Sequence, residues 1–210
     1  MKLGIESDTW GSEMRIVFAT GNQNKLKEAK EYLEPLGHNV EQLLVAGKAP
    51  DFIEPQIEDL QQVTLSKLEQ AIAMMPKSEL SSCAILVEDS GLFIDSLKGF
   101  PGVYSSYAYK TIGPRGILRL MGQTKLRGCE YRAVSILFMQ GKKIIKTGIC
   151  RGEISLEITG NGGFGYDPIF IPEVSDGRTF SQMSESEKSS MSHRGKSLKA
   201  LSEAISSPSM

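Results

Sequence analysis

Apolar residues along the chain alternate between short β-branched runs and stretches with helical spacing. Residues 15–19 and 40–45 are such runs, which predict two strands. Between them, Leu26, Ala29 and Leu33 recur at the three- and four-residue spacing of a helix face. The first part of the chain therefore predicts a strand, a helix and a second strand.

A second unit of the same kind follows. Residues 60–76 have helical spacing, and residues 84–87 form an apolar run that predicts a buried strand of a parallel sheet. Glu88 and Asp89 come directly after this run. Ser90 and Gly91 are then expected to turn the chain sharply. Because ligands bind at the carboxyl ends of strands in open α/β sheets, the two acids are candidates for chemistry.

The later part of the chain changes character. Residues 131–139 and 143–150 predict two strands joined as a hairpin at 140–142, and residues 151–158 are expected to add a third strand of this meander. The other expected elements are a helix over 112–121 with Gly122 as C-cap, a strand over 169–171, a helical turn at 184–188 and a C-terminal helix after Ser192. The fold class is α/β: a mixed, strongly twisted sheet with flanking helices and two lobes around a central cleft, the usual place for a ligand.

Length and charge narrow the function. The 210 residues carry a net charge of −1 with acids and bases intermixed, which disfavours a nucleic-acid or membrane-surface protein. We expect residues 14–210 to form a single two-lobed domain and residues 1–13 to be an N-terminal extension. The three cysteines are too widely spaced for a metal motif and odd in number, which favours a reducing cytoplasm.

The loop at residues 20–25 joins the first strand to the first helix. Backbone N–H groups at a helix N-terminus favour an anion, and Lys25 adds a positive charge. The spacing of a P-loop is absent. A plain helix cap by Asn22 or Asn24 explains the polar residues as well, so both interpretations stay open.

The acids and the remaining polar loops suit a nucleoside triphosphate with Mg²⁺. Glu54, Glu88 and Asp89 offer hard oxygen ligands, and a carboxylate not used for Mg²⁺ would orient or deprotonate an attacking water. Phe164, within the glycine-rich loop 160–168, offers an aromatic face to a flat ring. Each feature also has an ordinary explanation: the acids would solvate a loop, and Phe164 would belong to the core.

Lysine, histidine and arginine side chains near the C-terminus complete this set of polar residues. Lys188 and Arg194 offer positive charge near the C-terminus, where His193 precedes Arg194 at the predicted helix start. Taken alone, Lys188 would be a solvated lysine and His193 part of a helix cap. All the loops together point to water attack on phosphorus rather than a covalent intermediate, since no serine elbow or paired cysteine is present.

Five segments carry a family resemblance. They are Ala19-Thr20-Gly21-Asn22-Gln23-Asn24-Lys25, Glu88-Asp89-Ser90-Gly91-Leu92, Gly99-Phe100-Pro101-Gly102-Val103-Tyr104-Ser105, Gly163-Phe164-Gly165-Tyr166-Asp167-Pro168 and Ser192-His193-Arg194-Gly195-Lys196. In this order they resemble the signature blocks of the inosine triphosphate pyrophosphatase family, also called XTP/dITP diphosphatases. The resemblance implies a two-lobed α/β fold, a homodimer, and Mg²⁺-dependent hydrolysis of ITP, dITP and XTP to the monophosphate and pyrophosphate.

The resemblance also implies roles for single residues. Asp89 matches the proton acceptor and metal-linked acid, and Glu54 the second metal carboxylate, with Glu58 as the alternative. The substrate-binding residues that it implies are Thr20, Gly21, Asn22, Gln23, Asn24 and Lys25 at the triphosphate, Lys67 and Ser90 nearby, Phe164, Gly165, Tyr166 and Asp167 at the base, and Lys188, His193 and Arg194.

Base selection follows from hydrogen-bond chemistry. Hypoxanthine and xanthine present an acceptor O6 and a donor N1–H, whereas adenine presents the reverse. Donors on His193 and Arg194 with an acceptor on Asp167 would pair with the former, and buried groups left unpaired against adenine discriminate by about 10⁴-fold in favourable cases. Guanine shares O6 and N1–H, so this pattern does not exclude GTP.

Three alternatives remain at this stage. A non-catalytic nucleotide sensor would use the same scaffold without turnover, although the intact pair of acids argues against it. A structured-RNA binder is disfavoured by the near-neutral charge. The related Maf-like nucleotidases open on a different, serine-rich loop. The leading hypothesis requires Asp89 to lie in one groove with Lys25 and Arg194.

Overall fold

The computed structural model describes residues 13–206, so the predicted extension lies almost wholly outside the described residues. Within them the strands form one mixed sheet in the order β2-β1-β3-β5-β6-β7, with β4 paired to β3. The strands are β1 (Arg15–Phe18), β2 (Asn39–Gln42), β3 (Ala84–Ile94), β4 (Pro101–Gly102), β5 (Gly128–Met139), β6 (Lys142–Ile154) and β7 (Phe170–Pro172). β1 is parallel to β2 and β3, and the remaining pairs are antiparallel.

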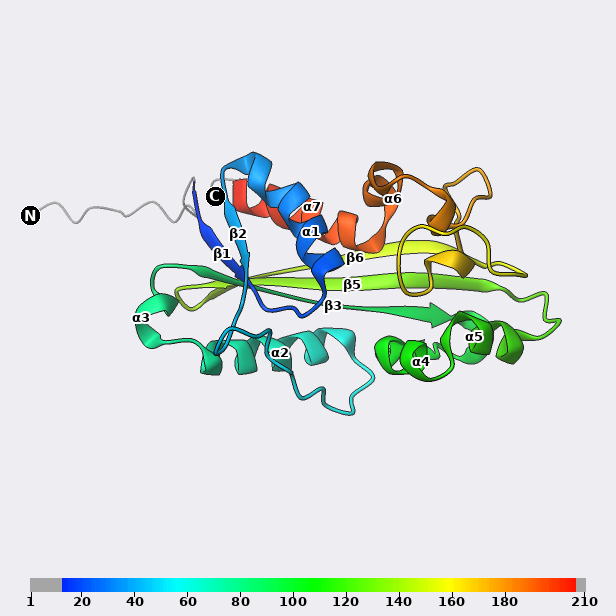
Figure 1. The fold of residues 1–210 in the computed structure, drawn as a ribbon, viewed down its shortest axis with the longest axis horizontal. Coiled ribbons are helices and arrows are strands. Elements are labelled where there is room, and N and C mark those ends of the chain that lie inside the picture. The colour runs from blue at the N-terminus through cyan, green and yellow to red at the C-terminus, as the bar shows by residue number, and fades with distance from the viewer. Residues whose placement is uncertain (1–12, 207–210) are drawn as a thin grey trace, which may run out of the picture.

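Helices cover both faces of this sheet (Figure 1). α1 and α7 lie on one face, and α2 lies on the other beside α3, α4 and α5. The helices are α1 (Gln23–Leu33), α2 (Leu60–Met74), α3 (Lys77–Leu80), α4 (Ser105–Thr111), α5 (Gly113–Met121), α6 (Glu185–Met191) and α7 (His193–Ser206). The predicted mixed α/β class is therefore confirmed. No helix in the described part of the chain is long and apolar enough to cross a membrane.

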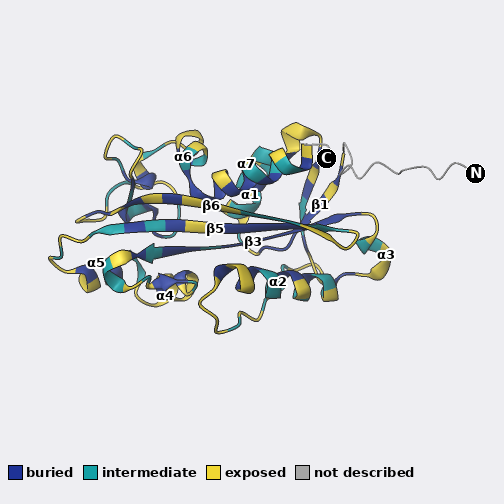
Figure 2. Ribbon diagram, turned by 180° about the vertical axis from the view of Figure 1, so that it is seen from behind, coloured by how far each residue is buried: buried dark blue, intermediate teal, exposed yellow. Residues whose placement is uncertain are grey.

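The central strands are buried on both faces (Figure 2). In β1, Ile16 and Phe18 pack toward α1 and α7, whereas Val17 packs in the cluster that contains Leu68 of α2. This is why the strand is a continuous apolar run rather than an alternating one. A further cluster at the far ends of the long strands unites α5 with β7. Apolar clusters therefore pack against the sheet both around β1 and at the far ends of the long strands.

The course of β3 differs from the prediction. Ser90 and Gly91 do not turn the chain, because β3 pairs with β5 without interruption from Ile85 to Ile94. Glu88 and Asp89 therefore lie within a strand. The neighbouring parallel strand β1 pairs with β3 only as far as Phe18 opposite Leu86. The two acids consequently lie just past the carboxyl end of β1, which is where a ligand is expected to bind in such a sheet.

Glycine is required at position 91 for close packing and not for a turn. A Cβ atom added there would lie 2.2 Å from the carbonyl oxygen of Gly102 in β4. Glycine therefore permits β4 to pair closely with the far half of β3. This closeness anchors the segment that leads into α4.

The second half of the chain is partly as predicted. The hairpin of β5 and β6 through Gln140 and Gly141 is confirmed. The expected separate strand over 151–158 is wrong, because β6 continues to Ile154 and its next partner is β7. α4 (Ser105–Thr111) was not predicted. All three cysteines, Cys83, Cys129 and Cys150, are buried and free.

Candidate active site

A pocket of about 580 Å³ opens where β1 ends beside β3. Asp89, Lys25 and Arg194 all line it, as the leading hypothesis requires. They come from β3, α1 and α7, three elements far apart in the sequence. Pockets of roughly 300–1,000 Å³ are typical of small-molecule sites. The volume therefore suits a nucleotide.

The loop before α1 is a capped helix start. The Asn22 side chain accepts hydrogen bonds from the backbone N–H groups of Asn24 (2.9 Å) and Lys25 (3.3 Å), which confirms the capping interpretation. Thr20 is buried, and its hydroxyl accepts from the Asn22 backbone at 3.1 Å. Gly21 also lines the pocket. The Thr20 and Asn22 side chains are therefore engaged with the backbone of the loop, and Lys25 supplies its positive charge.

Gln23 is directed elsewhere. It does not line the pocket, and its amide donates to Gln42 of β2 at 3.0 Å. Gln42 in turn donates to the carbonyl oxygen of Thr20 at 2.7 Å. The side chain of Gln23 therefore supports the loop from outside, and its predicted substrate contact has no geometric support.

Asp89 makes a close ion pair across the pocket. Its Oδ1 lies 2.6 Å from Nζ of Lys67, which is carried by α2, and both side chains are 12% exposed. Oδ2 of Asp89 is buried and has no hydrogen-bond partner among the described residues. One carboxylate oxygen is thus paired with Lys67, and the other is buried with its hydrogen-bonding capacity unused.

The two candidate metal acids near α2 lie apart. Glu54 is exposed on the connection before α2 and lines the same pocket as Asp89. Glu58 lines a different hollow, with Arg132 and Thr147. The position of Glu54 therefore fits a second ligand better than that of Glu58.

Glu88 is buried beneath the pocket and does not line it. Its Oε2 lies 2.9 Å from Nζ of Lys25 and 3.3 Å from Nε of Arg194. Burial alone would raise the pKa of Glu88, but Arg194 and Lys25 outweigh it and hold this pKa well below its usual range. A carboxylate so stabilised is a poor proton acceptor near neutral pH. In this structure Glu88 is therefore a buried counter-ion of Lys25 and Arg194 outside the lining of the pocket.

Arg194 is held on several sides. Besides Glu88, its guanidinium contacts Glu28 of α1 through Nη1 (2.7 Å) and the Ser90 hydroxyl through Nη2 (3.0 Å). It is 2% exposed, and although burial opposes its charge, Glu88 and Glu28 raise its pKa above the usual value. Nη1 and Nη2 each donate one hydrogen bond to the protein, and Nε faces Glu88 without a hydrogen bond, so a second N–H on each of Nη1 and Nη2 remains unused among residues 13–206.

His193 is oriented by an aromatic neighbour. Its ring stacks on that of Tyr131 in β5 with centroids 4.4 Å apart and planes within 8°. Burial, together with the charge of Arg194, lowers the pKa of His193 well below its usual value, so the imidazole is neutral at pH 7. Its Nδ1 is buried without a partner in residues 13–206. A neutral ring with an unused nitrogen is suited to reading a hydrogen-bond pattern.

The position of α7 depends on a glycine in β6. A Cβ atom added at Gly148 would lie 1.9 Å from the carbonyl oxygen of His193. The start of α7 therefore sits directly on the backbone of the sheet. This contact fixes the depth at which His193 and Arg194 enter the pocket.

The loop from Phe164 to Asp167 closes the other side. Asp167 accepts from the Phe164 backbone at 2.7 Å and is 2.7 Å from Nζ of Lys188, which lies 4.2 Å from the Phe164 ring centroid. Burial raises the pKa of Asp167, and the Lys188 ammonium limits this rise. Gly165 and Tyr166 also line the pocket. The expected base-side residues are thus gathered in one place.

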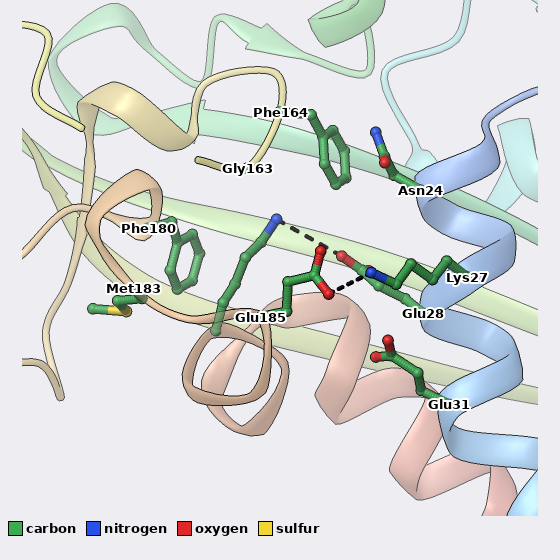
Figure 3. A pocket seen from close by; sticks show the side chains of 10 residues that line it. Asn24, Lys27, Glu28, Glu31, Gly163, Phe164, Phe180, Met183 and Glu185 are labelled. Carbon is green, nitrogen blue, oxygen red and sulfur yellow. Dashed lines mark hydrogen bonds and ion pairs between the residues drawn. The ribbon is translucent and has the colours of Figure 1, made fainter. Parts of the chain in front are cut away.

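A smaller hollow of about 100 Å³ adjoins this side and shares Asn24, Phe164 and Lys188 with the main pocket. Figure 3 shows Asn24, Glu28 and Glu31 of α1 facing Phe164 and Phe180 across it. Glu28 also lies 3.7 Å from Nζ of Lys188. A single carboxylate therefore stands between the two deepest cations of the pocket.

Several pocket residues were not predicted. Tyr131 has the position of an ordinary strand residue, and Lys110 lies on the unpredicted α4. Glu28, which lines the smaller hollow and contacts Arg194, has the helical position of a solvated acid. The signal that marks Glu28 is its place one turn after the capped loop, on the same helix as Lys25. Nothing local distinguishes Tyr131.

The fold and pocket define an α/β protein with a cleft lined by Lys25, Arg194 and the ion pair of Asp89 and Lys67. A model of the Ham1 family matches residues 16–204, and the chain belongs to this family. The family resemblance drawn from the five sequence blocks is thereby confirmed.

Named relatives agree with this membership. A dITP/XTP pyrophosphatase of Thermococcus kodakarensis is 43% identical over 186 residues, covering 89% of this chain and 94% of the relative. One from Pyrococcus horikoshii is 43% identical over 190 residues, covering 90% and 96%. Among solved structures, a HAM1 protein from Coxiella burnetii is similar with a TM-score of 0.76 and 30% identity, over 91% of this chain and 98% of that one.

Proposed function

We propose that this protein is a nucleotide pyrophosphatase that hydrolyses ITP, dITP and XTP to the nucleoside monophosphate and pyrophosphate. The observation that carries this proposal is that Asp89, Lys25 and the buried Arg194 line one pocket, and that Oδ2 of Asp89 has no hydrogen-bond partner among the described residues. Relatives with 43% identity bear the name dITP/XTP pyrophosphatase, which supports the same activity here.

Asp89 and Glu54 suit a Mg²⁺ ion. Asp89 has a buried carboxylate oxygen without a partner, and Glu54 lines the same pocket. Mg²⁺ usually takes one or two carboxylates and otherwise binds water and substrate phosphates. When bound, the ion supplies positive charge that neutralises the triphosphate.

The chemical step assigned to the protein is proton transfer. Asp89 Oδ2 accepts a proton from a water molecule whose oxygen forms a bond to the α-phosphorus. The bond from this phosphorus to the α,β-bridging oxygen breaks, and its electron pair leaves with pyrophosphate. Lys25 stabilises the negative charge of the triphosphate during this exchange.

Base selection is assigned to the deep side of the pocket. The two unused N–H groups of Arg194 and the neutral ring of His193 offer hydrogen bonds to O6 of a purine, while Phe164 offers a face for stacking. Adenine would leave such donors opposite its amino group. This arrangement of donors favours 6-keto purines over adenine.

Glu88 is assigned a positioning part instead of a catalytic one. It is the shared counter-ion of Lys25 and Arg194, so it links the phosphate loop to the base-reading helix α7. A fixed negative charge there keeps both cations oriented without contacting the substrate.

The wider setting stays a prediction. We propose a homodimer in the cytoplasm with no nucleic-acid or membrane partner, on the family resemblance, the free cysteines and the net charge of −1. Size measurement in solution by light scattering tests the dimer.

Hydrolysis of ITP in ¹⁸O-labelled water tests the reaction. We expect pyrophosphate to be released with the label in IMP alone, because attack at the α-phosphorus puts the water oxygen there. Label in pyrophosphate, or release of inorganic phosphate, would contradict the assigned step. Binding of ITP with no turnover would instead favour a nucleotide sensor.

A further inference from the structure

Lys67 occupies the position at Asp89 that a cation would take. Its Nζ is 2.6 Å from Asp89 Oδ1 and 3.4 Å from the carbonyl oxygen of Glu88. It also lies 5.6 Å from the ring centroid of Phe52. Lys67 is therefore held at the reacting end of the pocket by a carboxylate, a carbonyl and an aromatic face.

The carboxylates around this position do not form a ready metal site. Within residues 13–206, no group of three or more His, Cys, Asp or Glu residues could hold a metal ion. Glu54 is exposed, on a connection outside the helices and strands. A divalent ion approaching the protein alone would meet one carboxylate that already has a positive partner, and two like charges on one carboxylate repel.

We propose that Lys67 is an internal counter-ion that blocks Asp89 in the nucleotide-free protein, so that the divalent ion enters only together with the triphosphate. This inference rests on the proposed function for the identity of the nucleotide. Phosphate oxygens give the Lys67 ammonium a new partner, which frees Asp89 Oδ1. The flexible four-carbon stem of lysine allows this change of partner without movement of α2.

The reason for such an arrangement lies in the geometry of Asp89. Without a partner, a carboxylate at the pocket wall would be free to rotate, or to hold a metal ion before any substrate arrives. Lys67 keeps Oδ1 fixed, while Oδ2 is buried without a hydrogen-bond partner among residues 13–206. The pocket is thereby ordered before the nucleotide binds.

Titration of the free protein with Mn²⁺, followed by electron paramagnetic resonance, tests the proposal. We expect Lys67→Met, which keeps the length of the stem, to bind Mn²⁺ on the order of tenfold more tightly than the unmodified protein, because a nearby positive charge is removed. Lys67→Arg should bind as weakly as the unmodified protein. Adding Asp89→Asn to Lys67→Met should abolish the gain.

A matched control is available in the same pocket. Lys110 lines it from α4, so Lys110→Met removes the same charge away from the Asp89 pair and should change Mn²⁺ binding far less. Should Lys67→Met not fold, as judged by circular dichroism, Lys67→Gln serves in its place. Equal Mn²⁺ affinity of the unmodified protein and the neutral Lys67 variant would overturn the proposal.

The outcome is separable from that of the proposed function. Pyrophosphate release from ITP is measured on the same preparation of unmodified protein. Hydrolysis of ITP without any effect of Lys67 on Mn²⁺ binding leaves the function intact and removes the counter-ion. Tighter Mn²⁺ binding by Lys67→Met without ITP hydrolysis retains the counter-ion and removes the function.

Discussion

The two ends of the pocket are built differently. At the end proposed for the reaction, Asp89 and Lys67 form a single pair, each side chain 12% exposed, and Glu54 is exposed on a connecting segment. At the base-reading end, Arg194 and His193 are buried, and the Arg194 guanidinium contacts two carboxylates and a hydroxyl. The first end has charges that can exchange partners, and the second has charges that are fixed.

This difference matches what each end must do. Chemistry on a triphosphate requires groups that change partners as charge moves and product leaves. Discrimination between bases requires donors and acceptors that cannot adapt to the wrong base. Glu88 contacts both Lys25 and Arg194, and it thereby joins the proposed triphosphate loop to the proposed base-reading end.

The largest expected effect is at the reacting end. Asp89→Asn keeps the shape of the side chain and removes its ability to accept a proton. We expect kcat for ITP to fall by about 10²–10⁴-fold, the usual contribution of a positioned base. The control is a circular dichroism spectrum that shows the variant to be folded at the assay temperature, and a kcat within threefold of the unmodified value would refute the role of Asp89.

The link between the ends is expected to be mainly a stability effect. Glu88→Gln leaves Lys25 and Arg194 without their shared negative charge, and removing one member of a buried ion pair costs about 3–5 kcal/mol. Urea unfolding measures this loss. A loss of unfolding free energy below about 1 kcal/mol would mean that Glu28 alone is sufficient to balance the charge of Arg194. Glu88 would then not couple Lys25 to Arg194.

The fixed end is expected to give stability a pH dependence. The pKa of buried His193 is lowered in the folded protein, so the unfolded chain takes up a proton first as pH falls. Stability from the neutral ring is complete above about pH 6.5 and is lost at about 1.4 kcal/mol per pH unit below it. His193→Asn should reduce this slope.

His38 is the comparison for that experiment. Burial lowers its pKa as well, but less strongly. His38→Asn should therefore reduce the slope by a smaller amount. Equal unfolding curves at pH 7 and pH 5.5 for the unmodified protein would show that His193 is not buried in its neutral form.

A smaller effect is expected from the aromatic support of His193. Tyr131→Leu keeps an apolar side chain in the core but removes the stacking partner, a contact worth about 0.5–1.5 kcal/mol. We expect the preference for ITP over ATP, measured as the ratio of kcat/KM values, to fall by about three- to tenfold. Tyr131→Phe, which keeps the ring, should retain the preference.

The smallest effect is expected at Gln23. Its amide faces Gln42 and not the pocket, so Gln23→Ala should change kcat/KM for ITP by less than about twofold, as surface substitutions usually do. A loss beyond tenfold would restore the substrate contact that the sequence pattern suggested. Asn22→Ala is the matched comparison and should destabilise α1 by about 1 kcal/mol.

Local patterns predicted most elements but not the course of β3. The hairpin of β5 and β6 and the cap of α1 depend on neighbouring residues, so the sequence shows them directly. Ser90 and Gly91 have the local composition of a turn, yet pairing with Ala133 and Arg132 keeps them extended. That pairing joins residues about forty positions apart, which no local pattern reveals.

The site was predictable where residues belong to recognisable loops. Asp89, Phe164 and Arg194 were found in this way and line one pocket. The supporting residues were not, because Glu28 and Tyr131 act through neighbours that only the fold brings near. Glu88 was singled out as an acid beside Asp89, and its burial between Lys25 and Arg194 could not be predicted from the sequence.

The ratio of kcat/KM for ITP to that for ATP, measured with Mg²⁺ at pH 7.5, tests the central claim most directly. A fixed reader at the deep end predicts a ratio of about 10³ or more, since buried donors would face the amino group of adenine unpaired. A ratio near one would contradict the account, because Arg194 and His193 would then not read the base.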